Sequence, residues 1–154
     1  EQRVIRGREV IKDFYNRQKA AELPAMVEQP FSLLIPELKV RISGRYDAVF
    51  RHGKAGEEVE IRDFKTSQVK DQTGAERRLK DNIQLAIYAL AWERTTNTPV
   101  SSLSLDFVES GLVATKTSID HAKTFDDIKK VAEGIARRDF KGGKNSLYKV
   151  VQPW

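Results

Sequence analysis

The segment from Glu57 to Ser110 constrains the fold most, because it predicts a strand, a long helix and a second strand in succession. Residues 57–67 alternate apolar and charged side chains, and residues 77–97 carry an apolar stripe at helical spacing. A strand, "SSLSLDFVES", follows at 101–110. Because a strand–helix–strand crossover normally places the later strand parallel to the earlier one, this segment predicts an α/β fold.

Further elements are expected on both sides of this segment. A basic amphipathic helix is predicted at 4–22, two strands joined by a tight turn at 27–36 and 38–50, a strand at 112–119, and a helix at 124–140 whose first turn has capping-box spacing. The first three strands suggest an antiparallel meander, so the sheet should be mixed and flanked by helices. Residues 137–154 are basic and interrupted by glycine, which predicts irregular structure.

Composition narrows the class of protein. The chain has 154 residues, of which 40% are hydrophobic and 32% charged, so we expect one folded domain over residues 1–154. Because the first residue is Glu and the sequence begins within a predicted helix, we expect this domain to be a fragment of a longer chain. The sequence has no cysteine, which excludes disulfides, zinc–thiolate sites, iron–sulfur clusters and a cysteine nucleophile. A net charge of +5 favours a polyanionic partner. No apolar run could span a bilayer, so we expect an intracellular protein with no membrane partner, located in the cytoplasm.

The strand at 57–67 ends in an unusual way. Val59, Ile61, Asp63 and Lys65 are spaced by two, so all four side chains project to one side of the strand. Two apolar residues are therefore followed by an acid and a lysine on the same face. This pair is either a buried salt bridge or a metal ligand with a cation beside it, and taken alone the salt bridge is the better interpretation.

A second carboxylate favours the metal. Asp47 lies on the preceding predicted strand, sixteen residues before Asp63. Two carboxylates from adjacent strands can converge on a hard cation such as Mg²⁺, which prefers oxygen ligands. A bound Mg²⁺ can polarise a phosphodiester and lower the pKa of an attacking water, while Lys65 orients that water or stabilises the developing charge.

Three short motifs now carry a resemblance. They are Gly44-Arg45-Tyr46-Asp47, then Asp63-Phe64-Lys65-Thr66, then Gln84 followed four residues later by Tyr88. In this order and at this spacing they resemble the PD-(D/E)XK nuclease superfamily, and specifically its RecB-like branch with motifs G-x-x-D, D-x-K-T and Q-x-x-x-Y. The resemblance covers roughly residues 28–110 and implies a restriction-endonuclease-like fold with a mixed sheet.

The resemblance also implies roles for individual residues. Asp47 and Asp63 would bind Mg²⁺ or Mn²⁺, the backbone carbonyl of Phe64 would complete the ligand set, and Lys65 would be the catalytic lysine. Gln84 and Tyr88 would line the site from one face of the helix, a face that Trp92 extends, and would contact DNA. Glu28 matches an acid at the start of the first strand of this branch and would be a further metal ligand.

The implied function is a metal-dependent deoxyribonuclease, an exonuclease acting on single-stranded or end-containing DNA. The stretch "LSLDFVESG" and the elements after it are similar to nuclease domains fused to UvrD-like helicase motors. That likeness implies a helicase in the same chain or complex and a role in DNA end processing, recombination or repair.

One departure from the family pattern leaves an alternative open. The family's first motif offers a histidine on a helix before the first strand, whereas this chain has none before His52. Either the sequence begins after that helix or the histidine is lost. The alternative is therefore a catalytically inactive module of the same fold that binds DNA or a helicase. His52, in a predicted turn, and His121, before a predicted helix, are expected to be surface residues.

Overall fold

The computed structural model describes residues 2–19 and 21–139, which form one five-stranded sheet with helices on both faces. The strands are β1 (Met26–Ile35), β2 (Val40–His52), β3 (Glu58–Lys65), β4 (Ser102–Phe107) and β5 (Leu112–Lys116). The helices are α1 (Gln2–Gln18), α2 (Gln72–Lys80), α3 (Ile83–Thr96) and α4 (His121–Ala136), with a 3₁₀ turn η1 (Pro36–Leu38) between β1 and β2.

The strands lie in the order β1-β2-β3-β4-β5. All neighbours are antiparallel except β3 and β4, which are parallel and joined through α2 and α3. The predicted α/β fold with a mixed, helix-flanked sheet is therefore confirmed, and so are the initial meander and the parallel crossover. None of the helices within residues 2–19 and 21–139 has the length and apolar character needed to cross a membrane.

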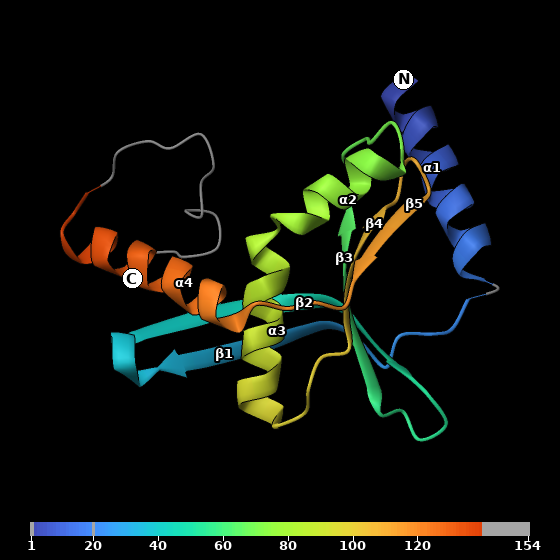
Figure 1. The fold of residues 1–154 in the computed structure, drawn as a ribbon. Coiled ribbons are helices and arrows are strands. Elements are labelled where there is room, and N and C mark those ends of the chain that lie inside the picture. Colours follow the sequence, from blue (N-terminus) through green and yellow to red (C-terminus); the bar gives the residue numbers. More distant parts are fainter. Residues whose placement is uncertain (1, 20, 140–154) are drawn as a thin grey trace.

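The sheet forks at β2. This strand pairs with β1 along residues 40–49 but with β3 only from Ala48 to His52. On the far side of Ala48 the two partners separate, so β1 and β2 continue as a two-stranded arm. Figure 1 shows this arm leaving the sheet at the left while β3, β4 and β5 point upward, with α3 in the angle between them.

Two hydrophobic clusters fix this angle. The larger lies between α3 and the centre of the sheet and contains buried residues such as Val49, Ile61, Leu85 and Phe107. The smaller packs the arm against α3 and α4; its buried members are Leu33, Ile35, Ile42, Ile87, Leu90, Ala91 and Ile128. Since burial of each large aliphatic side chain contributes about 1.5–3 kcal/mol, α3 is held by both branches of the fork.

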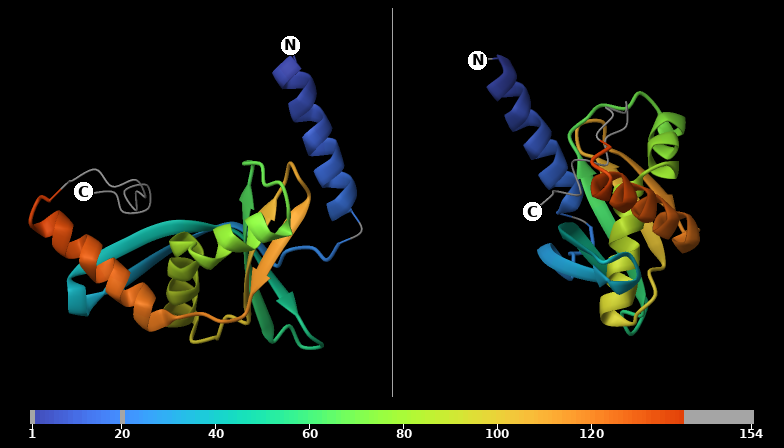
Figure 2. Two further views of the ribbon diagram at one scale, coloured as in Figure 1. Left: turned by 45° about the horizontal axis from the view of Figure 1, so that its top comes forward. Right: turned by 90° about the vertical axis from the view of Figure 1, so that its left-hand side faces the viewer.

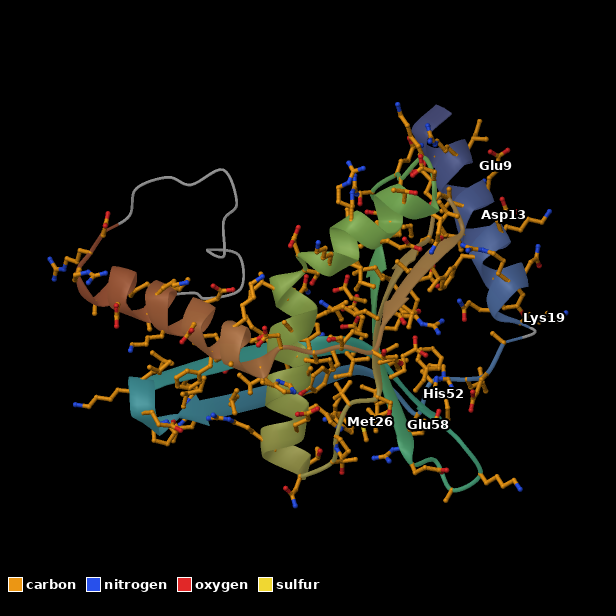
Figure 3. All side chains as sticks on the ribbon, in the orientation of Figure 1. Glu9, Asp13, Lys19, Met26, His52 and Glu58 are labelled. Atoms are coloured by element: carbon orange, nitrogen blue, oxygen red, sulfur yellow. The ribbon has the colours of Figure 1, made fainter. Side chains whose placement is uncertain are left out.

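Helix α1 lies alone on the other face of the sheet (Figure 2, right). The ring of Phe14 meets the ring of Phe64 edge to face at 5.4 Å, and Arg17 Nη2 donates to the carbonyl oxygen of Val108 at 2.7 Å. Glu9 and Asp13 are exposed along it, and Lys19 is exposed directly after its end (Figure 3). Helix α1 therefore contacts the strand that carries Asp63 and Lys65, from the opposite side.

Several predicted boundaries were wrong for identifiable reasons. The helix predicted at 77–97 is two helices, because Asn82 accepts a hydrogen bond from Leu85 N at 2.8 Å and starts α3 anew. Helix α4 begins at His121 rather than Thr124, since Asp120 is its N-cap. The first helix ends at Gln18, four residues before its predicted end. Of the basic tail predicted to be irregular, residues 140–154 lie outside the described residues.

The expectation that His52 lies in a turn was also wrong. His52 is the last residue of β2, close to the segment that follows α1 (Figure 3). Its Nδ1 lies 2.7 Å from Glu22 Oε2 and its Nε2 lies 2.8 Å from Glu60 Oε2. Hydrogen bonds to Glu60 and then Glu22 raise the pKa of this imidazole. His52 thus ties that segment to β3.

Candidate active site

Asp47 and Asp63 lie near each other at the fork. Ala48 of β2 and Arg62 of β3 form the last pair of their ladder, so Asp47 and Asp63 are the first residues beyond it on each strand. The two carboxylates are close enough for the charge of Asp47 to raise the pKa of Asp63. One carboxylate is fixed further, because Asp47 Oδ2 accepts a hydrogen bond from the backbone N–H of Phe64 at 3.0 Å. The side chain of Asp63 is 2% exposed.

A continuous polar chain leads from Asp63 to helix α3. Lys65 Nζ lies 2.6 Å from Asp63 Oδ2 and donates to Gln84 Oε1 at 3.0 Å. Gln84 Nε2 in turn donates to the hydroxyl of Tyr88 at 2.7 Å. Gln84 and Tyr88 are one helical turn apart, so they point to the same side of α3. The structure therefore brings together Asp63, Lys65, Gln84 and Tyr88.

The electrostatics of this group reflect its depth. Burial raises the pKa of Asp63, the attraction of Lys65 lowers it, and repulsion from Asp47 raises it again, so that the pKa lies above its ordinary value. Burial also raises the pKa of Tyr88, helped by the negative charges of Asp63, Asp47 and Glu28. The site thus has crowded negative charge that a cation would relieve.

Glu28 lies at the edge of this group. It lies between Val27 and Gln29, which pair with Ala48 and Tyr46 on β2. Its Oε2 is 3.2 Å from Arg45 Nη1, and its side chain is 65% exposed. Its φ of 50° lies in the left-handed region, a conformation that a non-glycine residue adopts at a cost and that recurs at functional sites. The structure does not bring Glu28 into contact with Asp63 as a third carboxylate.

The donor set fits a hard divalent cation only in part. Two carboxylates on neighbouring strands supply the oxygen ligands that such ions prefer. However, in the part of the chain that the structure describes, no three His, Cys, Asp or Glu residues form a group able to hold a metal. The remaining positions would therefore fall to backbone oxygen and water, which Mg²⁺ accepts readily.

The backbone of Phe64 is suitably placed to contribute one of these ligands. Its N–H points towards β2, where it donates a hydrogen bond to the carboxylate of Asp47. In an extended strand the N–H and C=O of one residue point to the same side, so the carbonyl of Phe64 is also directed towards the fork. The carbonyl of Lys65, by contrast, points the other way and accepts from Val108 N at 3.0 Å.

Aromatic packing that the sequence analysis did not identify supports Tyr88. The rings of Phe31 and Tyr46 stack at 4.7 Å, and each meets the ring of Tyr88 edge to face. The sequence offers one sign of this packing, which is Gly44. A Cβ at this position would lie 2.6 Å from the ring of Phe31, so only glycine leaves room for the ring. Trp92 is 3% exposed and packs on Tyr46, which makes it a core residue instead of a surface for stacking bases.

Comparison with known proteins agrees with this geometry. No curated protein matches the chain significantly. The sequence model of the PD-(D/E)XK nuclease superfamily, however, matches residues 2–146, almost the whole chain and the full five-stranded sheet with its flanking helices. The restriction-endonuclease-like arrangement expected from the three motifs is thus present. The chain belongs to the PD-(D/E)XK nuclease superfamily.

Proposed function

We propose that this protein is a metal-dependent deoxyribonuclease that hydrolyses phosphodiester bonds at the fork of the sheet. The observation that carries the proposal is the position of Asp63. It lies beside Asp47, whose charge acts on it, and is joined through Lys65 to Gln84 and Tyr88. A buried ion pair that served stability alone would not require a second carboxylate beside it, since that carboxylate adds repulsion.

Asp47, Asp63 and the carbonyl of Phe64 would hold Mg²⁺ or Mn²⁺. Such an ion polarises a phosphoryl oxygen and lowers the pKa of a bound water. The chain's own contribution is orientation and charge. The ammonium of Lys65 has three donors, of which Asp63 and Gln84 engage two, so one remains for a water or a phosphate oxygen. Gln84, itself held by Tyr88, fixes the direction of that donor.

The finer assignment extends the same proposal. The order of the three motifs supports the RecB-like branch, in which case the protein is an exonuclease for single-stranded or end-containing DNA. It would then be one domain of a longer helicase–nuclease, work in end processing, recombination or repair, and reside in the cytoplasm with the nucleoid. The net charge of +5 is consistent with DNA as the partner.

A second candidate function is a module of the same fold that binds DNA or a helicase without cleaving it. One observation favours it: within the described residues, no histidine or third acid joins Asp47 and Asp63. Two carboxylates and a carbonyl would bind a divalent ion loosely.

Cleavage assays distinguish the two functions. The protein would be incubated with a labelled single strand and with a duplex bearing a free end, over titrations of Mg²⁺ and Mn²⁺. Asp63→Ala and Asp47→Ala should abolish cleavage, whereas Asp13→Asn, an exposed substitution on α1, should leave it unchanged. If the unaltered chain gives no product above the Asp63→Ala background but still binds DNA, the non-catalytic module is the correct function.

A further inference from the structure

The end of β3 that carries the candidate active site has lost one of its two strand neighbours. Beyond Arg62, β3 stays paired with β4 as far as Lys65, whereas its pairing with β2 has already ended. On the β2 side the backbone N–H of Phe64 donates to the side chain of Asp47 instead of to a strand carbonyl. With one ladder in place of two, the positions of residues 63–65 depend more on contacts from outside the sheet.

Helix α1 provides such a contact from the back of the sheet (Figure 2). Successive residues of a strand point to opposite faces, so the ring of Phe64 is directed away from the side chains of Asp63 and Lys65. There it meets the ring of Phe14 edge to face at 5.4 Å. Phe64 is therefore held from two sides, by Phe14 through its ring and by Asp47 through its N–H.

A second contact of α1 leads to the next residue of β3. Arg17 Nη2 donates to the carbonyl oxygen of Val108 at 2.7 Å, and the N–H of Val108 donates to the carbonyl oxygen of Lys65 at 3.0 Å. Gly111 leaves room for the guanidinium, because a Cβ there would lie 2.9 Å from Arg17 Nη1. Helix α1 is thus connected to Phe64 directly and to Lys65 through one intermediate residue.

A buried carboxylate attracts Arg17 to this position. Asp106 pairs with Phe64 in the β3–β4 register, so its side chain points to the face that α1 covers, where it is 1% exposed. Burial raises the pKa of Asp106, and the charges of Arg17 and Arg62 oppose this rise. Charge attraction and the aromatic contact therefore act together to fix α1 behind the end of β3.

We propose that Phe14 is a positioning residue of the candidate active site. It holds Phe64 from behind, so that the N–H of Phe64 stays on Asp47 and its carbonyl stays directed towards the fork. Phe14 touches neither the substrate nor the reacting atoms and acts only through Phe64. Its importance for cleavage rests on the proposed nuclease function, whereas its effect on Phe64 does not.

Hydrogen exchange of the Phe64 amide, followed by NMR in EDTA, tests this effect without any cleavage. The strength of an edge-to-face aromatic pair corresponds to a factor of about 2–12 in an equilibrium constant. Since exchange reports local opening, Phe14→Ala should accelerate the exchange of this amide about 2- to 12-fold. Phe14→Leu keeps an apolar contact and should recover part of the protection.

The matched control is Tyr15→Ala, which removes the neighbouring aromatic ring from the same helix. Tyr15 is 61% exposed, so its loss should leave the exchange of the Phe64 amide unchanged. The amides of β4 should keep their exchange rates in both variants. Equal acceleration of the β4 amides in Phe14→Ala would overturn the proposal, because Phe14 would then serve the stability of the whole sheet. If Phe14→Ala fails to fold in a thermal melt, Phe14→Leu decides in its place.

Calorimetric titration with Mn²⁺ extends the test to the expected ligand. Coupling between two sites acts equally in both directions, so the Kd for Mn²⁺ should rise about 2- to 12-fold in Phe14→Ala and stay unchanged in Tyr15→Ala. A protein that cuts DNA, but in which these two variants agree in amide exchange and in Mn²⁺ affinity, refutes the inference alone. An unaltered chain that neither binds Mn²⁺ nor cuts DNA refutes the proposed function, and the exchange of the Phe64 amide then decides the inference.

Discussion

Replacing Lys65 with methionine tests whether the charge of Asp63 depends on this neighbour. The substitution keeps most of the aliphatic volume and removes the ammonium 2.6 Å from Asp63 Oδ2. Asp63 would stay buried beside Asp47 without a cation. Removing one partner of a buried ion pair costs about 3–5 kcal/mol, and because Lys65 is itself 30% exposed we expect a loss near the lower limit, about 3 kcal/mol.

The pH dependence of this loss follows from the direction of the shift. The folded-state pKa of Asp63 is already raised by burial, and without Lys65 it should rise further. A carboxyl whose folded pKa lies above its unfolded value binds a proton more readily in the folded chain, so stability falls as pH rises through the folded pKa. The loss of unfolding free energy in Lys65→Met, relative to the unaltered chain, should therefore be larger at about pH 7.5 than at about pH 5.

The assay is urea unfolding followed by circular dichroism, for Lys65→Met, Asp63→Asn, the double variant and the exposed control Lys54→Met. The double variant should recover most of the loss, because replacing a buried ion pair with neutral groups is often neutral or stabilising. Mn²⁺ at a hundredfold excess over Kd should stabilise Lys65→Met by about 2.7 kcal/mol. At one fixed Mn²⁺ concentration the gain should be larger for Lys65→Met than for the unaltered chain, because the carboxylate pair has lost its neighbouring ammonium. A change in Lys65→Met below about 0.5 kcal/mol, the range of ordinary surface substitutions, would refute the argument.

Three further predictions concern other parts of the molecule. Gly44→Ala should destabilise the chain by about 1–3 kcal/mol in urea unfolding, because its Cβ would overlap the packed ring of Phe31. Gly7→Ala has open space around it and should stabilise α1 by about 0.5–1 kcal/mol. Equal effects of the two substitutions would contradict this account of the packing. The raised pKa of His52 adds stability that is fully present below about pH 6.5 and is lost as pH rises through the folded pKa. In thermal melts recorded at increasing pH above about 6.5, the melting temperature of His52→Asn should therefore fall less than that of the unaltered chain. Gln84→Ala and Tyr88→Phe should weaken DNA binding in anisotropy more than Mn²⁺ binding in calorimetry, since neither residue is assigned as a ligand, and equal losses would contradict these roles.

The sequence by itself determined the elements and the motifs. Alternation marks β3 because a strand with one buried face needs apolar residues at every second position, and the crossover rule makes β4 its parallel neighbour. The spacing of Asp63 and Lys65 places both side chains on one face, and the spacing of Gln84 and Tyr88 does the same on a helix. These are local regularities of backbone geometry, so the chain order was enough to predict them.

Tertiary structure alone decided how these elements meet. The fork between β2 and β3, the depth of Asp63 and the bond from Lys65 to Gln84 join residues that are far apart in the chain. The contacts of His52 with Glu22 and Glu60 also join distant parts of the chain, and so does the packing of the Phe31 ring over Gly44. Burial and charge pairing arise only when separate segments exclude water together, and spacing along the sequence carries no information about which segments do so.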